Sequence, residues 1–217
     1  MGSVLFCPGD LMFDVQGFIL VGGASRRMGQ NKAHLRLGPK TMLERIAAEL
    51  SPVTSSVTLV GSPQGHVGHS LPTVPDVYEK WGALGGIHAA LSAARTDWII
   101  VVACDLPFVT RDLFVKLKSF IDESPNEFID AIVPLQPDGR PQPVCALYRR
   151  ETCLPEIERL ISAGEHTPRA LLASVRTRYV QFKGLHDLPG AENFFINLNT
   201  PEDFERAKGL AETGGPL

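Results

Sequence analysis

Six consecutive apolar residues, Trp98 to Ala103, place the strongest constraint on how this chain folds. The run has no polar position, so both faces of the strand that it forms must be covered. Such a strand lies in the middle of a sheet with helices on both sides. Cys104 and Asp105 follow directly, and the strand therefore carries them to the carboxyl edge of the sheet, where ligands bind in open α/β folds.

Strand and helix patterns alternate along the rest of the chain. Thr41 opens a helix, because Glu44 completes a capping box and the apolar residues that follow share one face. Thr110 is expected to cap a later helix in the same way. The patterns predict strands at 17–21, 56–60, 73–74, 98–103, 130–134, 144–148, 179–182 and 194–198, and helices at 41–50, 85–95, 110–121, 152–163, 168–174 and from 200 onward.

These elements predict a single α/β domain. The expected fold class is a three-layer α/β domain with a mostly parallel mixed sheet. A turn at 137–141 makes the following strand run back, so one strand of the sheet is antiparallel. We expect an extension over residues 1–15, the domain over 16–212 and a flexible tail over 213–217.

The charge balance limits the partners of the chain. Its 217 residues include 21 Lys plus Arg and 24 Asp plus Glu, for a net charge of −3. This balance supplies no broad positive field, so we expect neither a nucleic-acid nor a membrane partner. Any bound anion must be held locally, for example by backbone N–H groups at a loop or helix end. The four cysteines form no C-x-x-C pair, which favours a reducing, cytoplasmic location.

A glycine-rich, basic loop follows the first predicted strand. Paired Gly22 and Gly23 let the backbone approach a ligand closely, and successive N–H groups in such a turn can hold an anion. Arg26, Arg27 and Lys32 add positive charge. The loop has neither the G-K-[ST] of a P-loop nor the pattern G-x-G-x-x-G. From these residues alone, a phosphate site and an exposed turn with solvated cations are both open.

Four ordered blocks resemble the molybdenum cofactor guanylyltransferase family, within the wider nucleotidyltransferases that include sugar-nucleotide pyrophosphorylases. LVGGASRRMGQNK at 20–32 resembles the family's LAGGxSxRMGxDK, and GALGGI at 82–87 resembles its GPLAGI. ACDLPF at 103–108 resembles CDxP[FY], and FINLNTPE at 195–202 resembles FxNxNTPE. The connection from Asp76 to the second block is one residue shorter than in the family, and Val60-Gly61-Ser62 lacks an Asn that some relatives have there.

The resemblance implies a Rossmann-like fold of the nucleotide-diphospho-sugar transferase type, with a mixed sheet. It also implies a Mg²⁺-dependent transfer of GMP from GTP to molybdopterin. Arg27, Lys32 and Asp105 are then the catalytic residues, with Asp105 also binding Mg²⁺. The resemblance places Asn197 and Asn199 beside the metal and the pterin phosphate. The two residues are two apart on the last predicted strand, so their side chains lie on one face of it. The implied nucleotide-binding residues are Leu20, Val21, Gly22, Gly23, Ser25, Arg27, Lys32, Asp76, Gly82, Gly86 and Asp105.

Several alternatives remain open at this point. The nucleotide could be CTP, the acceptor could be a sugar phosphate, or the chain could be a nucleotide-binding module without turnover. Gly85 and Gly86 could serve tight helix packing instead of nucleotide contact, and Asn199 could satisfy backbone groups before the last helix. His66 and His69 are expected to be solvated loop histidines. The expected partners are GTP and molybdopterin, with transient contacts to proteins that deliver or accept the cofactor.

Overall fold

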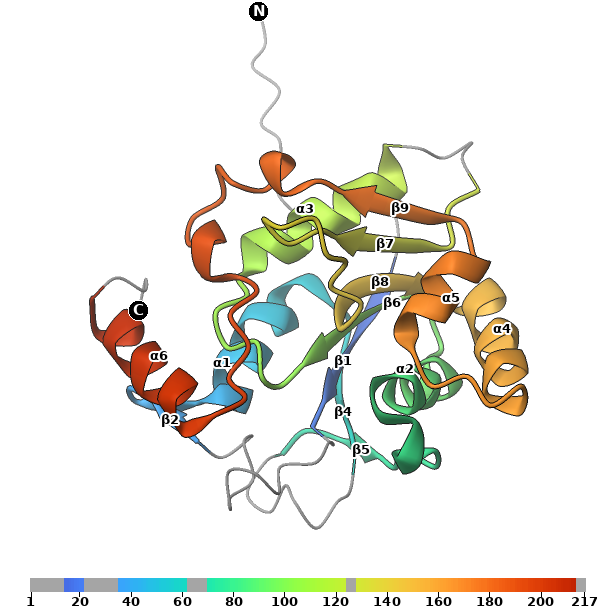
Figure 1. Cartoon of the computed structure of the whole chain (residues 1–217), viewed down its shortest axis with the longest axis horizontal. Coiled ribbons are helices and arrows are strands. Elements are labelled where there is room, and N and C mark those ends of the chain that lie inside the picture. Colours follow the sequence, from blue (N-terminus) through green and yellow to red (C-terminus); the bar gives the residue numbers. More distant parts are fainter. Residues whose placement is uncertain (1–13, 22–34, 62–69, 124–127, 214–217) are drawn as a thin grey trace, which may run out of the picture.

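The protein has a seven-stranded sheet as its centre (Figure 1). The structure is a computed structural model that describes residues 14–21, 35–61, 70–123 and 128–213. Strands β1 to β9 span Val15–Leu20, Arg36–Leu37, Lys40–Thr41, Val57–Val60, Thr73–Val74, Trp98–Ala103, Ala131–Pro134, Cys145–Arg149 and Thr177–Val180. Helices α1 to α6 span Met42–Leu50, Gly82–Ala93, Arg111–Asp122, Arg150–Ser162, Pro168–Ser174 and Pro201–Thr213.

The strand order is β5-β4-β1-β6-β8-β7-β9, and β8 alone runs against its neighbours in this sheet of described residues. β6 lies between β1 and β8, and its all-apolar run is buried from Trp98 to Val102. The predicted central strand and the predicted antiparallel strand are both confirmed. The chain leaves β1 toward β4 on one side and later returns to β6 on the other, and in α/β sheets this change of direction marks the usual ligand crevice.

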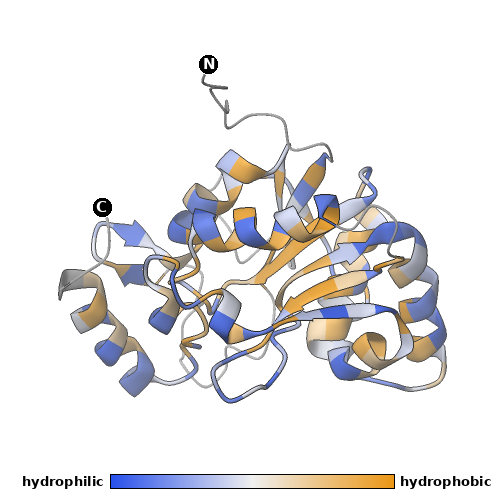
Figure 2. Ribbon diagram, turned by 90° about the horizontal axis from the view of Figure 1, so that it is seen from above, coloured by the Kyte–Doolittle hydropathy of each residue, from blue (hydrophilic) through white to orange (hydrophobic). Residues whose placement is uncertain are grey.

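Helices cover both faces of the sheet, which gives the predicted three layers (Figure 2). Ile100 and Val102 of β6 point toward α1 and α3, whereas Ile99 and Val101 point toward α2, α4 and α5. This alternation follows from the period of two along a strand. A third, smaller cluster around Leu198 lies between α6 and the two-stranded hairpin of β2 and β3.

Helix capping confirms one prediction and corrects another. At α1 the Thr41 hydroxyl accepts from the Glu44 N–H at 3.1 Å, and the Glu44 carboxylate accepts from the Thr41 N–H at 2.7 Å, so the capping box is present. Thr110 does precede α3, but its side chain makes no capping hydrogen bond. The Arg111 N–H donates instead to the Glu49 carboxylate of α1 at 2.8 Å.

The largest difference from the sequence pattern lies at 194–198. The predicted strand is absent there, and the segment is irregular. Phe194, Phe195 and Leu198 are all buried, so its apolar residues are covered by packing and not by a sheet with alternating faces. The hairpin of β2 and β3 was not predicted, and β9 begins two residues before the predicted strand at 179. None of the described helices is long and apolar enough to cross a bilayer.

Candidate active site

The chain segments that leave β1, β4 and β6 are tied together at the carboxyl edge of the sheet. The Val21 N–H donates to the Val60 carbonyl at 2.9 Å, and the Cys104 N–H donates to the Leu20 carbonyl at 3.0 Å. Both bonds continue the parallel pairing beyond the last residues of the strands. They fix where the glycine-rich loop begins, directly beside the segment that carries Asp105.

Asp105 is half-buried and stands two residues after the end of β6. Its backbone carbonyl accepts a hydrogen bond from the Leu198 N–H at 3.0 Å. Because Leu198 is itself fully buried, this bond anchors the irregular segment 195–199 against the end of β6. The structure thus places the segment that carries Asn197 and Asn199 next to the end of β6 and Asp105, although the two blocks are far apart in the chain.

The two asparagines do not share the face of a strand, because the segment that carries them is irregular. Asn197 donates a long hydrogen bond of 3.4 Å to the Phe195 carbonyl and lines a hollow of about 610 Å³ against α6. Asn199 is exposed immediately before α6. Asp203 and Thr200 cap that helix: the Asp203 carboxylate accepts from the Asn199 and Thr200 N–H groups at 3.1 and 3.0 Å.

Asp76 follows β5 at the same edge and forms a tight turn. One carboxylate oxygen, Oδ1, accepts from the Tyr78 N–H at 2.9 Å. This turn lies directly on α2: a Cβ at Gly85 would stand 2.4 Å from the Tyr78 carbonyl oxygen and 3.0 Å from Asp76 Oδ1. Any side chain at position 85 would therefore push the turn outward. Gly85 therefore allows the close contact between α2 and the Asp76 turn.

Two further glycines of the same block have different surroundings. A Cβ at Gly86 would lie 3.1 Å from Leu20 Cδ1, so Gly86 lets α2 pack closely against the end of β1. Gly82 has a φ of +54°, where glycine carries little strain, and open space surrounds the place of its Cβ. These close contacts support the alternative that Gly85 and Gly86 serve helix packing. Gly82, in contrast, is exposed at the first residue of α2.

An aromatic cluster packs next to the Asp76 turn. The ring of His88 meets Tyr78 edge-to-face with centroids 4.8 Å apart, and Trp81 stacks on His166 at 4.7 Å. Burial lowers the pKa of His88 despite the nearby carboxylates of Glu158 and Asp76, which raise it. No spacing in the sequence signals these ring contacts, because the partners of His88 and His166 come from other segments of the chain.

Several of the residues expected in the site lie outside the described part of the chain. These are Gly22, Gly23, Ser25, Arg27 and Lys32. Arg26 and the loop histidines His66 and His69, which were not assigned to the site, also lie outside the described residues. Among the residues that are described, no group of three or more His, Cys, Asp or Glu side chains could hold a metal. Mg²⁺ prefers one or two carboxylates completed by substrate phosphates and water. The carboxylate of Asp105 is a hard oxygen donor that fits this ion, and the segment anchored to its backbone carries the amide oxygens of Asn197 and Asn199.

Comparisons with known proteins found a matching family model and similar sequences. Residues 17–180 match the model of the MobA-like NTP transferase domain family. A protein of Pelotomaculum thermopropionicum named probable molybdenum cofactor guanylyltransferase is 36% identical over 93% of this chain and 95% of its own length. The molybdenum cofactor guanylyltransferase of Desulfosudis oleivorans is 32% identical over 92% of this chain and 97% of its own length.

Solved structures show the same architecture. Molybdopterin-guanine dinucleotide biosynthesis protein A from Archaeoglobus fulgidus superposes with a TM-score of 0.76 at 26% identity, covering 91% of this chain and 98% of that one. A 2-C-methyl-D-erythritol 4-phosphate cytidylyltransferase from Thermus thermophilus, at 17% identity, has a TM-score of 0.64 over 90% of this chain and 98% of its own, and so shares the fold. The chain therefore belongs to the MobA-like NTP transferase family, as a nucleotidyltransferase related to the molybdenum cofactor guanylyltransferases.

Proposed function

We propose that this protein transfers GMP from GTP to molybdopterin, which yields the guanine dinucleotide form of the cofactor and pyrophosphate. The names of its relatives support this reaction, since they are molybdenum cofactor guanylyltransferases at 36% and 32% identity over most of both chains. The structural observation that carries the proposal is the hydrogen bond from Leu198 to Asp105. It joins the segment proposed for the acceptor phosphate to the backbone of Asp105, the residue whose carboxylate is proposed to act on the nucleotide.

The reaction is one substitution at phosphorus. A phosphate oxygen of the acceptor forms a bond to the α-phosphorus of GTP, while the bond from that phosphorus to the oxygen of pyrophosphate breaks. The bonding electrons leave with pyrophosphate, whose negative charge grows as the bond breaks. The protein's main tasks are therefore to align the two phosphates and to stabilise the leaving charge.

Each proposed residue has a task that suits its chemistry. The backbone after Leu20 and Val21 would donate N–H groups from Gly22, Gly23 and Ser25 to the triphosphate. Arg27 offers a forked pair of donors to phosphate oxygens, and Lys32 offers a mobile point charge. Asp76, Gly82 and Gly86 lie on the side of β5 and α2, where the nucleoside would bind.

Asp105 would hold Mg²⁺, with Asn197 and Asn199 beside it. When bound, the ion would neutralise charge on the phosphate oxygens. Two hydrogen bonds hold the backbone around Asp105: the Cys104 N–H donates to the Leu20 carbonyl, and the Leu198 N–H donates to the Asp105 carbonyl. These bonds fix the place from which the Asp105 carboxylate extends. Asn197 and Asn199 offer amide groups that can orient the acceptor phosphate by hydrogen bonds.

A second candidate, transfer from CTP to molybdopterin or from another nucleotide to a sugar phosphate, uses the same chemistry. The relatives' names favour guanylyl transfer. A nucleotide-binding module without turnover would be expected to lack Arg27, Lys32 or Asp105, and this chain has all three. The proposal includes a cytoplasmic location and transient contacts with proteins that deliver or accept the cofactor. Cys145 and Cys153, which are buried thiols, suit a reducing compartment.

Thermal-shift titration with GTP, CTP, ATP and UTP in the presence of Mg²⁺ tests the nucleotide. Ligands that bind only the folded state raise the unfolding temperature in proportion to the logarithm of their concentration over Kd. We expect GTP to give the largest shift and omission of Mg²⁺ to reduce it. A preferential response to CTP would contradict the choice of GTP.

A further inference from the structure

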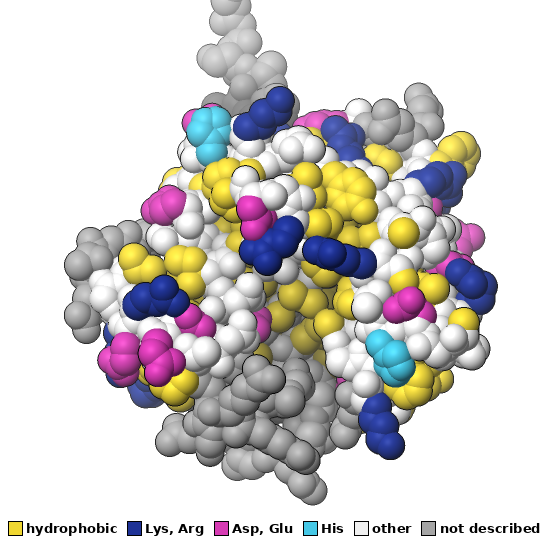
Figure 3. Space-filling model, viewed as in Figure 1, with side chains coloured by type: hydrophobic (Ala, Val, Ile, Leu, Met, Phe, Trp, Pro, Cys, Tyr) yellow, Lys and Arg dark blue, Asp and Glu magenta, His cyan; other side chains and the backbone are white. Residues whose placement is uncertain are grey.

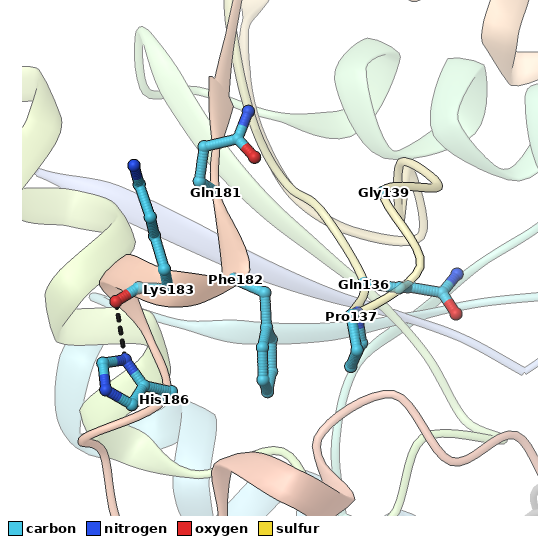
Figure 4. Close-up of a pocket in the computed structure, with 7 residues that line it drawn as sticks. All are labelled: Gln136, Pro137, Gly139, Gln181, Phe182, Lys183 and His186. Carbon is cyan, nitrogen blue, oxygen red and sulfur yellow. Dashed lines mark hydrogen bonds between the residues drawn. The ribbon is translucent and has the colours of Figure 1, made fainter.

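A second hollow lies along the same edge of the sheet, beyond Asp105. It has a volume of about 440 Å³ and is formed by the turn after β7 and the segment after β9. Gln136 and Pro137 line it on one side, and Gln181, Phe182 and Lys183 on the other. Figure 4 shows the rings of Pro137 and Phe182 pointing the same way from opposite sides of this hollow.

Aromatic contacts connect this hollow to the candidate active site. The ring of Phe182 meets that of Phe195 edge-to-face, with centroids 6.4 Å apart and an angle of 64°. Phe195 belongs to the segment that Leu198 anchors to Asp105. Figure 3 shows hydrophobic side chains through the centre of this face, with Lys and Arg side chains beside them. The hollow is therefore continuous in packing with the segment proposed to hold the acceptor phosphate.

The sheet sets the distance between the two places. From β6, which leads to Asp105, the order continues through β8 to β7 and β9. Neighbouring strands lie about 4.8 Å apart, so the ends of β7 and β9 are roughly 10 to 14 Å across the edge from that of β6. A substrate whose phosphate lies beside Asp105 can span this distance and reach the hollow if it carries a rigid fused ring at the end opposite its phosphate.

The lining suits such a ring. Phe182 and Pro137 offer flat apolar surfaces, and aromatic side chains bind planar rings by stacking. The amides of Gln136 and Gln181 each supply donors and an acceptor at the rim, and Lys183 adds a positive charge. His186 Nδ1 donates to the Lys183 carbonyl at 2.6 Å, which closes the turn that carries Phe182 and Lys183.

We propose that this hollow binds the pterin ring of the acceptor, between Phe182 and Pro137, while the acceptor phosphate reacts beside Asp105. The inference rests on the proposed function and deepens it, because it assigns the ring and the phosphate of one substrate to two places on the sheet edge. The hydrogen-bonding edge of a pterin matches the amides, and its face matches the two rings.

The variant Phe182→Leu tests this subsite, because leucine keeps an apolar contact with Phe195 but removes the aromatic face. Phe128→Leu is the matched control, since Phe128 is 71% exposed and does not line the hollow. The readouts are the Kd of freshly released molybdopterin by quenching of its fluorescence, its KM, kcat, and the Kd of GTP. We expect the acceptor Kd and KM to rise about three- to tenfold, with kcat and GTP binding unchanged.

An unchanged acceptor Kd in folded Phe182→Leu would overturn the proposal, as would an equal loss of GTP and acceptor affinity. If Phe182→Leu does not fold, the variant Pro137→Ala in the exposed turn on the opposite side of the hollow takes its place. The same measurements apply, and an unchanged acceptor Kd would again overturn the proposal. A wild-type protein that binds molybdopterin through Phe182 yet releases no pyrophosphate from GTP would support the subsite and contradict only the proposed function.

Discussion

The backbone N–H of Leu198 donates to the carbonyl oxygen of Asp105 at 3.0 Å, although the two residues are far apart in the chain. This bond holds an irregular segment against the end of the most buried strand. Its consequence is that the segment carrying Asn197 and Asn199 is held next to the residue that we propose as the Mg²⁺ ligand. The predictions below test the roles that follow from this arrangement.

Replacing Asp105 by Asn should abolish most turnover while leaving the fold intact. The variant keeps the shape of the side chain but removes the charge proposed to hold Mg²⁺, and we expect kcat to fall at least about 100-fold, as with other preorganised electrostatic groups. Pyrophosphate release in a coupled assay is the measurement. Asp112→Asn, an exposed change in α3, is the control. Near-wild-type release by Asp105→Asn would remove the metal assignment.

Lys32→Ala should raise the barrier to transfer by about 2–4 kcal/mol, because a cation that stabilises the leaving pyrophosphate would be lost. Lys32 lies outside the described residues, so this prediction rests on the resemblance of its loop to the family pattern. The quantity to compare is kcat/KM for GTP. Lys40→Ala removes an exposed lysine of β3 and should leave the value unchanged. The same kcat/KM in Lys32→Ala would exclude this role.

Gly85→Ala should destabilise the protein and weaken GTP binding together. The added Cβ would stand 2.4 Å from the Tyr78 carbonyl, and overpacking of this kind costs about 1–3 kcal/mol. The displaced turn would carry Asp76 away from its place beside the nucleotide. Urea unfolding and a GTP titration measure the two effects.

Gly209→Ala is the matched control for this change. Gly209 lies in α6 with open space around the place of a Cβ, so alanine there should stabilise the helix by up to about 1 kcal/mol. GTP affinity should not change in this control. If Gly85→Ala behaves like Gly209→Ala, the close contact between α2 and the Asp76 turn does not matter for binding.

Stability should fall as the pH drops below about 6.5, and His88 should account for part of the fall. Burial lowers its pKa from 6.5, although Glu158 of α4 and Asp76 attract the charged form. Tyr78 and Ser92 are its other neighbours. Because the unfolded chain takes up a proton in this range and the folded protein resists it, the free energy of unfolding decreases as pH falls from 6.5 toward the folded pKa.

Urea unfolding at pH 7.5 and at pH 5.5 measures this dependence. The variant His88→Gln cannot titrate and should show a smaller loss between the two values, whatever its stability at pH 7.5. An identical loss in wild type and His88→Gln would show that other groups cause it.

The sequence predicted the central architecture because its signals are local. Trp98 to Ala103 is apolar at every position, and the structure forms a strand with those limits. Thr41 and Glu44 predicted their capping box from a spacing of three residues. These features depend on neighbours in the chain, so they can be derived without the fold.

Features that depend on distant contacts could not be derived in this way. Phe194 to Leu198 has the apolar content of a strand, but its partners are side chains of other elements, and the segment stays irregular. The need for Gly85 becomes visible only when the Asp76 turn is seen against α2. For the site, the family resemblance predicted Asp105, Asn197 and Asn199, whereas no pattern indicated that Phe182 and Pro137 line a common hollow.

Pyrophosphate release from each of the four nucleotides, with and without molybdopterin, tests the central claim most directly. The proposed function predicts rapid release from GTP only when Mg²⁺ and molybdopterin are both present, with the guanine dinucleotide found by mass spectrometry in equal amount. Release from CTP in preference to GTP, or no acceptor-dependent release from any nucleotide, would contradict it.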